Sequence, residues 1–198
     1  MRNILIIGAG KSASYLIKYF LDKSESEDIH ITIGDINIKN ARKLIGDHDH
    51  ANAIQLDVFD KESRGNAIKV ADIVVSMLPA RFHIEVAKDC VTYSTHMVTA
   101  SYVSPEMQAL DSSVKNKGLV FMNEIGVDPG IDHMSAMKVI DHIRGDGGKL
   151  QAFETFTGGL VAPESDNNPW GYKFTWNPRN VVLAGQGTCK FIQNKQYK

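Results

Sequence analysis

The chain has 198 residues, of which 43% are hydrophobic and 23% are charged, and its formal net charge is −1. These values are those of an ordinary globular protein, and they argue against a nucleic-acid partner, which usually requires a basic surface. No apolar run is long enough to cross a membrane, and the chain enters its first predicted strand without a charged leader. Its two cysteines, Cys90 and Cys189, lack metal-type spacing. We therefore expect a cytoplasmic protein with reduced thiols, no metal and no membrane or nucleic-acid partner.

The N-terminal segment contains a glycine-rich turn between a strand and a helix. The strand predicted from Asn3 is fully apolar over residues 4–7 and stops at Gly8, and an apolar stripe at helical spacing begins at Ala13. Gly8 permits the turn, Gly10 leaves room for a ligand beside the backbone, and Ala13 is small enough for close helix packing. A pyrophosphate at this turn meets free N–H groups and the positive end of the helix dipole. The pattern therefore predicts a dinucleotide-binding turn.

The second predicted strand covers residues 28–35 and ends in Asp35. Dinucleotide-binding units place an acid about 20 residues after the glycine turn, where its carboxylate holds the adenosine ribose. Such an acid repels the 2′-phosphate of NADP, so we expect NAD as the cofactor. The alternative is that Asp35 caps the helix that begins near Ile38, and the two roles are compatible.

Four further strands alternate with helices. They are predicted over residues 51–58, 72–79, 96–101 and 119–124. Asp57, in the first of these, either contacts adenine or caps the helix that begins near Lys61. His83 is interpreted as a helix cap or a surface residue, and Ser104 begins a helix with proline at its first position. The alternation predicts an α/β fold, a Rossmann-type doubly wound parallel sheet over residues 1–125, with ligands at the carboxyl ends of its strands.

The pattern changes after residue 125, and residues 126–198 are predicted to begin a second, α+β domain. Residues 126–130 form a Gly-Val-Asp-Pro-Gly turn, and the helix after it has one apolar face. Strands are expected over 149–157 and 172–176, with a long irregular loop between them. Loops of this length are usually functional or disordered, and the aromatic residues here argue against disorder.

Three motifs carry a family resemblance: residues 99–105 (TASYVSP), residues 122–133 (MNEIGVDPGIDH), and the segment from Gly158-Gly159-Leu160 to Trp176. They closely resemble saccharopine dehydrogenase of the L-glutamate-forming type (saccharopine reductase), and the likeness extends along essentially the whole chain. The resemblance implies an enzyme of lysine metabolism that binds a nicotinamide dinucleotide and an amino-acid substrate and forms a homodimer when full length. It oxidises the secondary amine of saccharopine to an imine, which water splits into L-glutamate and 2-aminoadipate 6-semialdehyde.

The resemblance also implies roles for individual residues. The cofactor would contact Gly8, Gly10, Lys11, Ser12, Ala13, Asp35, Ile36, Asp57, Val58, Leu78, Pro79, Ile125 and Val127. The substrate would contact Ser101, Tyr102, Thr157, Lys173 and Trp176. Asp128 would accept the amine proton, and Tyr102 would hydrogen-bond or relay it. The alternative for Asp128 is a purely local role in its Asp-Pro-Gly turn.

Three features depart from the family pattern. Thr157 stands where the fungal enzymes carry a cysteine, and Asp35 stands where several NADP-dependent fungal members lack an acid. The chain also stops at Lys198, so the rest of the substrate domain and its carboxylate-binding arginine are expected to be missing. Two other functions stay open: a related amine oxidoreductase, such as a carboxynorspermidine synthase or lysine 6-dehydrogenase, and a non-catalytic NAD-binding module.

Overall fold

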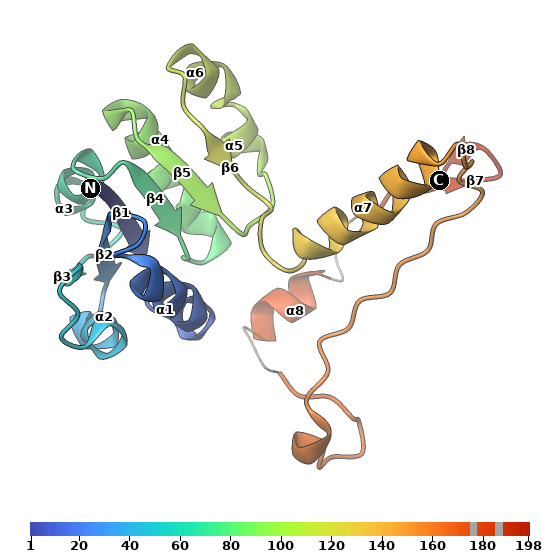
Figure 1. Ribbon diagram of the computed structural model, residues 1–198, viewed down its shortest axis with the longest axis horizontal. Helices are drawn as coiled ribbons and strands as arrows, with labels where there is room; N and C mark the ends of the chain where they lie inside the picture. The colour runs from blue at the N-terminus through green and yellow to red at the C-terminus, as the bar shows by residue number, and fades with distance from the viewer. Residues whose placement is uncertain (175–177, 185–187) are drawn as a thin grey trace. The chain divides into compact units, whose positions relative to one another are not determined.

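A computed structural model of the chain describes residues 1–174, 178–184 and 188–198. Six parallel strands form one sheet in the order β3-β2-β1-β4-β5-β6 (Figure 1). The strands are β1 (Arg2–Ile7), β2 (Ile29–Asp35), β3 (Ala51–Gln55), β4 (Ile73–Ser76), β5 (His96–Thr99) and β6 (Phe121–Met122). Because β1 pairs with β2 on one side and β4 on the other, the strand order reverses there, as in dinucleotide-binding folds. The predicted Rossmann-type sheet is confirmed.

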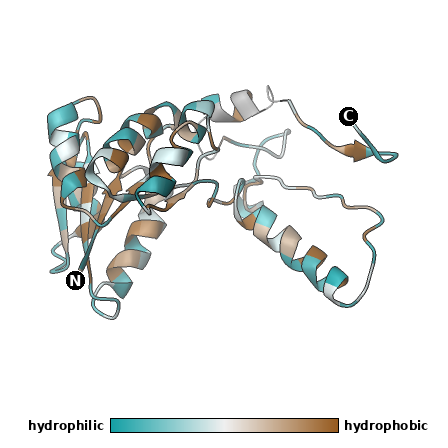
Figure 2. Ribbon diagram, turned by 90° about the horizontal axis from the view of Figure 1, so that it is seen from above, coloured by the Kyte–Doolittle hydropathy of each residue, from teal (hydrophilic) through white to brown (hydrophobic). Residues whose placement is uncertain are grey.

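Helices cover both faces of this sheet. They are η1 (Lys11–Ala13), α1 (Ser14–Lys23), α2 (Ile38–Ile45), α3 (Lys61–Lys69), η2 (Ala80–Phe82), α4 (His83–Tyr93), α5 (Pro105–Gln108) and α6 (Asp111–Asn116). Alternate residues of β1 point to opposite faces: Ile4 and Ile6 join the core made with α1 and α2, whereas Leu5 and Ile7 join the core made with α3, α4 and α5. This explains why residues 4–7 of β1 and 73–75 of β4 are apolar without alternation. Brown, the colour of hydrophobic residues, is prominent in the sheet region in Figure 2.

Three helices begin at side-chain caps. Asn37 accepts a hydrogen bond from a backbone N–H of α2, Asp60 accepts two from α3, and Ser104 accepts one from α5. Each bond satisfies a donor that the first helical turn leaves unpaired. The helix start at Ser104 is therefore confirmed. The cap alternatives for Asp35 and Asp57 are wrong, because the caps lie two and three residues further along the chain.

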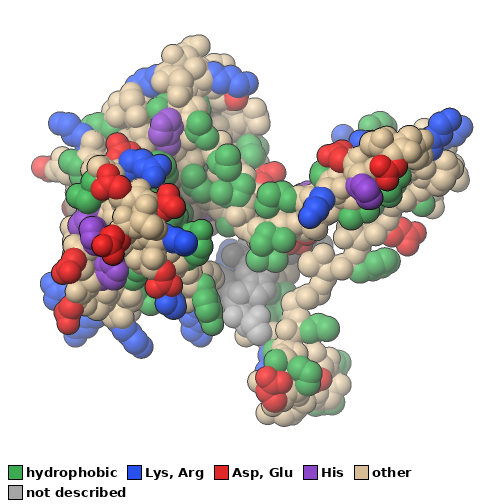
Figure 3. Space-filling model, in the orientation of Figure 1, with side chains coloured by type: hydrophobic (Ala, Val, Ile, Leu, Met, Phe, Trp, Pro, Cys, Tyr) green, Lys and Arg blue, Asp and Glu red, His purple; other side chains and the backbone are tan. Residues whose placement is uncertain are grey.

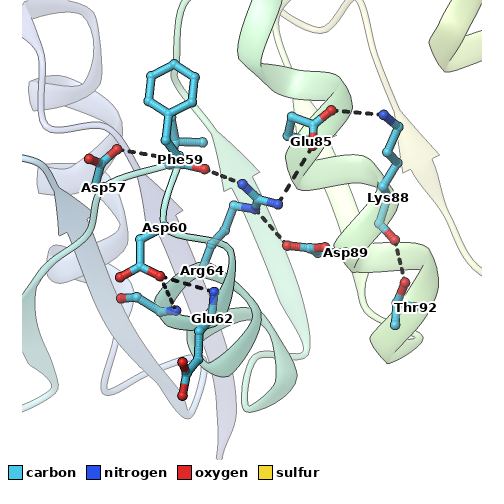
Figure 4. A network of polar contacts seen from close by, with 11 residues as sticks. Asp57, Phe59, Asp60, Glu62, Arg64, Glu85, Lys88, Asp89 and Thr92 are labelled. Atoms are coloured by element: carbon cyan, nitrogen blue, oxygen red, sulfur yellow. Dashed lines mark hydrogen bonds and ion pairs between the residues drawn. The ribbon is translucent and has the colours of Figure 1, made fainter.

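A buried arginine joins the segment after β3 to α4 (Figure 4). The Nε of Arg64 donates to the Asp89 carboxylate over 2.7 Å, and its guanidinium also donates to the carbonyl of Val58. The Glu85 carboxylate lies 3.9 Å from the same guanidinium. The side chains of Arg64 and Asp89 are only 4% and 10% exposed, so each charge depends on the other for compensation.

We expect Arg64→Met to lower the free energy of unfolding by about 3 kcal/mol, because it leaves Asp89 as a buried charge without a partner. Urea denaturation followed by circular dichroism measures the change. The matched control is Lys18→Met, which breaks the exposed ion pair with Asp22 and should cost about 0.5 kcal/mol or less. Equal losses in the two variants would contradict a structural role for the buried pair.

The chain divides into two compact units, the sheet unit (Met1–Phe153) and the C-terminal unit (Glu154–Lys198). The sheet unit also contains α7 (Ile131–Gly145). The C-terminal unit contains η3 (Pro163–Ser165), α8 (Pro178–Ala184), and the antiparallel pair β7 (Ile192–Gln193) and β8 (Gln196–Tyr197). The predicted domain boundary after residue 125 stays a prediction.

Two predicted strands are not found among the residues that the structure describes. Residues 149–157 are irregular, and so are residues 172–174; residues 175 and 176 lie outside the described residues. A strand needs a neighbour for its N–H and C=O groups, and the described part of the chain places none beside residues 149–157. Phe156 is accordingly 90% exposed. The sequence of the segment alone does not supply this neighbouring strand.

Charged side chains of both signs lie on the sheet unit. On the face shown in Figure 3, its acidic and basic side chains are interspersed, in keeping with a formal net charge of −1. Among the described residues, no helix is both long enough and apolar enough to span a bilayer. The same residues contain no cluster of three or more His, Cys, Asp or Glu side chains that could hold a metal ion.

Candidate dinucleotide and amine site

The glycine-rich turn after β1 combines one structural glycine with one that leaves open space. Gly8 has a φ of +108°, and a Cβ there would lie 3.0 Å from the carbonyl oxygen of Met77. Gly10 is extended, with φ −77° and ψ 179°, and a Cβ there would meet no atom within 4 Å. The fold therefore requires glycine at position 8, whereas glycine at position 10 leaves the space beside the backbone free.

Backbone donors line this space. The N–H groups of Gly10, Lys11 and Ser12 have no acceptor in the described part of the chain. They lie at the start of η1, which continues into α1, so they carry the positive end of the helix dipole. Ala13 is 1% exposed and packs into the core. This turn fits a pyrophosphate, whose oxygens would accept hydrogen bonds from these groups.

Asp35 hydrogen-bonds its own chain. One carboxylate oxygen accepts from the backbone N–H of Ala9 over 2.8 Å. The other accepts from the backbone N–H of Asn37 over 2.8 Å and from the side-chain amide of Asn40 over 3.3 Å. Its negative charge is thus partly compensated by donors, and it ties the end of β2 to the glycine-rich turn. Ile36, next to it, is 67% exposed.

The other predicted cofactor residues also follow the carboxyl ends of strands. Asp57 accepts from the backbone N–H of Phe59 over 2.9 Å, which shapes the segment after β3. Val58 and Leu78 are half-buried against the core, and Pro79 is exposed just before η2. Ile125 and Val127, both exposed, follow β6. Parallel strands end at one edge of the sheet, so these residues share the edge where such folds bind ligands.

Tyr102 and Asp128 meet at this edge. The Tyr102 hydroxyl donates to a carboxylate oxygen of Asp128 over 3.4 Å. Tyr102 follows β5 and Asp128 follows β6, which are neighbouring strands. Although Tyr102 is largely exposed, desolvation of its hydroxyl raises the pKa of this side chain, and the Asp128 charge raises it further. Tyr102 is therefore a hydrogen-bond donor at neutral pH.

A closed loop presents Asp128. The backbone N–H of Gly126 donates to the carbonyl of Pro129 over 2.8 Å, and that of Ile131 donates to the carbonyl of Gly126 over 3.0 Å. Gly130 has a φ of +150°, and a Cβ there would lie 2.1 Å from the Gly126 carbonyl oxygen. The loop is thus held by backbone bonds, while the Asp128 side chain bonds outward to Tyr102.

His83 is a buried residue of this edge that the sequence analysis missed. It is 4% exposed, so its interpretation as a cap or surface residue is wrong. Its Nδ1 lies 2.8 Å from the Ser76 hydroxyl, and its Nε2 lies 2.7 Å from the Ser101 hydroxyl and 3.3 Å from that of Thr99. Burial lowers the pKa of His83 to about 4. The available signal was that Ser76 and Ser101 come at the ends of successive strands.

The remaining predicted substrate residues belong to the C-terminal unit. Thr157 is exposed in an irregular segment, and Lys173 is half-buried in another. Trp176 lies outside the described residues. Their assignment to the substrate stays a prediction.

Comparison with known proteins covers nearly the whole chain. Residues 4–122 match the family model described as "Saccharopine dehydrogenase NADP binding domain", and residues 126–198 match "Saccharopine dehydrogenase C-terminal domain". The chain is 38% identical to a saccharopine dehydrogenase [NADP(+), L-glutamate-forming] of Pyricularia oryzae over 98% of its own length and 42% of that relative. It is also 38% identical to an alpha-aminoadipic semialdehyde synthase of Arabidopsis thaliana, over 96% of the chain and 20% of that relative.

A solved structure agrees with these relatives. Apo saccharopine dehydrogenase (L-Glu forming) of Saccharomyces cerevisiae superposes with a TM-score of 0.87 at 37% identity, covering 100% of this chain and 44% of that one. The chain therefore spans less than half the length of the relatives it matches.

The expectation that NAD is the cofactor is wrong. The matching N-terminal family model is an NADP binding domain, and the fungal relatives are named as NADP(+) enzymes. The Asp35 carboxylate is not a free charge at this edge, because its oxygens accept hydrogen bonds from Ala9, Asn37 and Asn40. With the fold, the glycine-rich turn and both family models in agreement, the chain belongs to the saccharopine dehydrogenase family.

Proposed function

We propose that this chain supplies the NADP-binding and proton-transfer parts of a saccharopine dehydrogenase of the L-glutamate-forming type. The observation that carries the proposal is the hydrogen-bonded pair of Tyr102 and Asp128 at the sheet edge where the glycine-rich turn also lies. A proton acceptor beside a dinucleotide site is what the oxidation of an amine requires. The family of the chain and its NADP-named relatives support the cofactor.

Different residues of the chain bind the cofactor and accept the proton. The N–H groups of Gly10, Lys11 and Ser12 would hold the pyrophosphate, and the bound cofactor supplies the hydride acceptor. As hydride leaves the carbon of the secondary amine, Asp128 accepts the proton from its nitrogen and a C=N bond forms. Tyr102 orients the carboxylate through its hydroxyl. Water then adds to the C=N bond, and cleavage of the carbon–nitrogen bond releases L-glutamate and the semialdehyde.

The test is turnover by the complete protein that carries these residues, with saccharopine as the amine. We expect formation of NADPH and of L-glutamate in equal amounts. Turnover with lysine or carboxynorspermidine instead of saccharopine would indicate a related amine oxidoreductase. Tight binding of NADP without turnover of any of these amines would indicate a non-catalytic module and would overturn the proposal.

A further inference from the structure

His83 connects two strands beneath the candidate site. Ser76 is the last residue of β4, and Ser101 lies two residues beyond the end of β5. The imidazole bridges them, with Nδ1 2.8 Å from the Ser76 hydroxyl and Nε2 2.7 Å from the Ser101 hydroxyl. Ser76 is 1% exposed, whereas Ser101 is half-buried. This series of hydrogen bonds therefore leads from the core to the sheet edge at which Tyr102, the next residue after Ser101, lies.

Ser101 is held at its backbone as well as at its side chain. Its N–H donates to the Thr99 hydroxyl over 3.3 Å, and its carbonyl accepts from the N–H of Glu124 over 3.1 Å. With the backbone fixed on both sides, the bond to His83 determines which rotamer the hydroxyl adopts. A hydroxyl fixed before a ligand arrives loses little entropy when it binds that ligand.

The imidazole is suited to this task because it is neutral. Burial keeps the pKa of His83 at about 4, so at neutral pH the ring carries one N–H donor and one lone pair. Whichever nitrogen holds the proton, the ring donates on one side and accepts on the other. If Ser76 donates to Nδ1, the ring donates from Nε2 to Ser101; if the ring donates from Nδ1 to Ser76, Nε2 accepts from Ser101. The bond at Ser76 therefore determines whether the Ser101 hydroxyl offers its proton or its lone pair to a ligand.

We propose that His83 is a positioning residue that fixes the Ser101 hydroxyl for a polar group of the amine substrate, with Ser76 as its anchor. This inference rests on the proposed function, and on the prediction from the family resemblance that Ser101 contacts the substrate. It assigns no proton transfer to His83. The alternative is that His83 only joins β4 to β5, in which case its loss would act on the fold and independently of Ser101.

A double-mutant cycle separates these roles. The complete protein is compared with His83→Leu, Ser101→Ala and the double variant, and the KM values for saccharopine and for NADP+ are measured. We expect each single variant to raise the saccharopine KM about tenfold, as for one lost hydrogen bond, with little change in the NADP+ KM. The double variant should match Ser101→Ala alone. Thr92→Val is the control, because the hydroxyl of Thr92 donates to the carbonyl of Lys88 on the same helix.

Conservative variants sharpen the test. His83→Gln, whose amide also has one donor and one acceptor, should restore most of the saccharopine affinity. If His83→Leu does not fold, Ser76→Ala replaces it in the cycle, with an expected threefold increase in the saccharopine KM that disappears in the Ser101→Ala background. Two results would overturn the inference while the proposed function stands. One is a double variant whose increase in the saccharopine KM is the product of the two single increases, and the other is an unchanged saccharopine KM in His83→Leu or in Ser101→Ala. A wild-type protein without saccharopine turnover would instead overturn the proposed function.

Discussion

Asp128→Asn should lower the turnover of saccharopine by about 10²–10⁴-fold, the range expected for the loss of a general base. The amide has nearly the size of the carboxylate, but it does not accept a proton at neutral pH. The loop that carries it is closed by backbone bonds between Gly126, Pro129 and Ile131, so its shape should persist. Binding of NADP should change little. Turnover and cofactor titration in the complete protein measure the two effects.

Two further variants are compared with Asp128→Asn. Asp141→Asn, an exposed acid-to-amide change on α7, should behave like wild type. Tyr102→Phe removes the bond of 3.4 Å to the carboxylate but keeps the proton acceptor, so its loss of turnover should be smaller. Wild-type turnover in Asp128→Asn would assign Asp128 to its turn alone.

Gly10→Val should weaken NADP binding by at least about 100-fold, since loss of pyrophosphate contacts removes several charge-assisted hydrogen bonds. The new side chain would enter the open space beside the N–H groups of Lys11 and Ser12. The fold should survive, because the backbone of Gly10 is extended and its Cβ position is free. Calorimetric titration with NADP and a thermal melt of the same sample measure both quantities.

Two other glycines provide the controls. Gly145→Val, at a position in α7 where a Cβ also meets no atom within 4 Å, should bind NADP as wild type does. Gly8→Val should reduce stability instead, because Gly8 has a positive φ and lies against the Met77 carbonyl. Wild-type affinity in Gly10→Val would show that this segment is a turn without a ligand role.

The Rossmann sheet was predictable because each of its signals is local. The apolar run of β1, the glycines after it and the stripe of α1 lie within about 25 residues. The alternation of strands and helices then leaves few possible topologies. Helix starts such as Ser104 follow from short-range hydrogen bonding.

The roles of Asp35 and His83 were not predictable, because their partners are distant in sequence. Asp35 bonds the N–H of Ala9, 26 positions earlier, and His83 bonds Ser101, 18 positions later. Such pairings exist only once the strand order is known. The strand expected over residues 149–157 failed for a related reason: its apolar residues fit a sheet, but a sheet also needs a second segment beside it.

The bond between Asp35 and Ala9 has a consequence for cofactor engineering. A residue at the end of the second strand is a natural target when cofactor preference is to be altered, because that position faces the adenosine ribose in this fold. Here the same carboxylate closes the glycine-rich turn through the backbone of Ala9. A substitution at Asp35 would therefore remove the acceptor of the Ala9 N–H and alter the shape of the glycine-rich turn, whatever it does to the preference for a cofactor. Retuning the cofactor would require a second substitution that restores the lost acceptor.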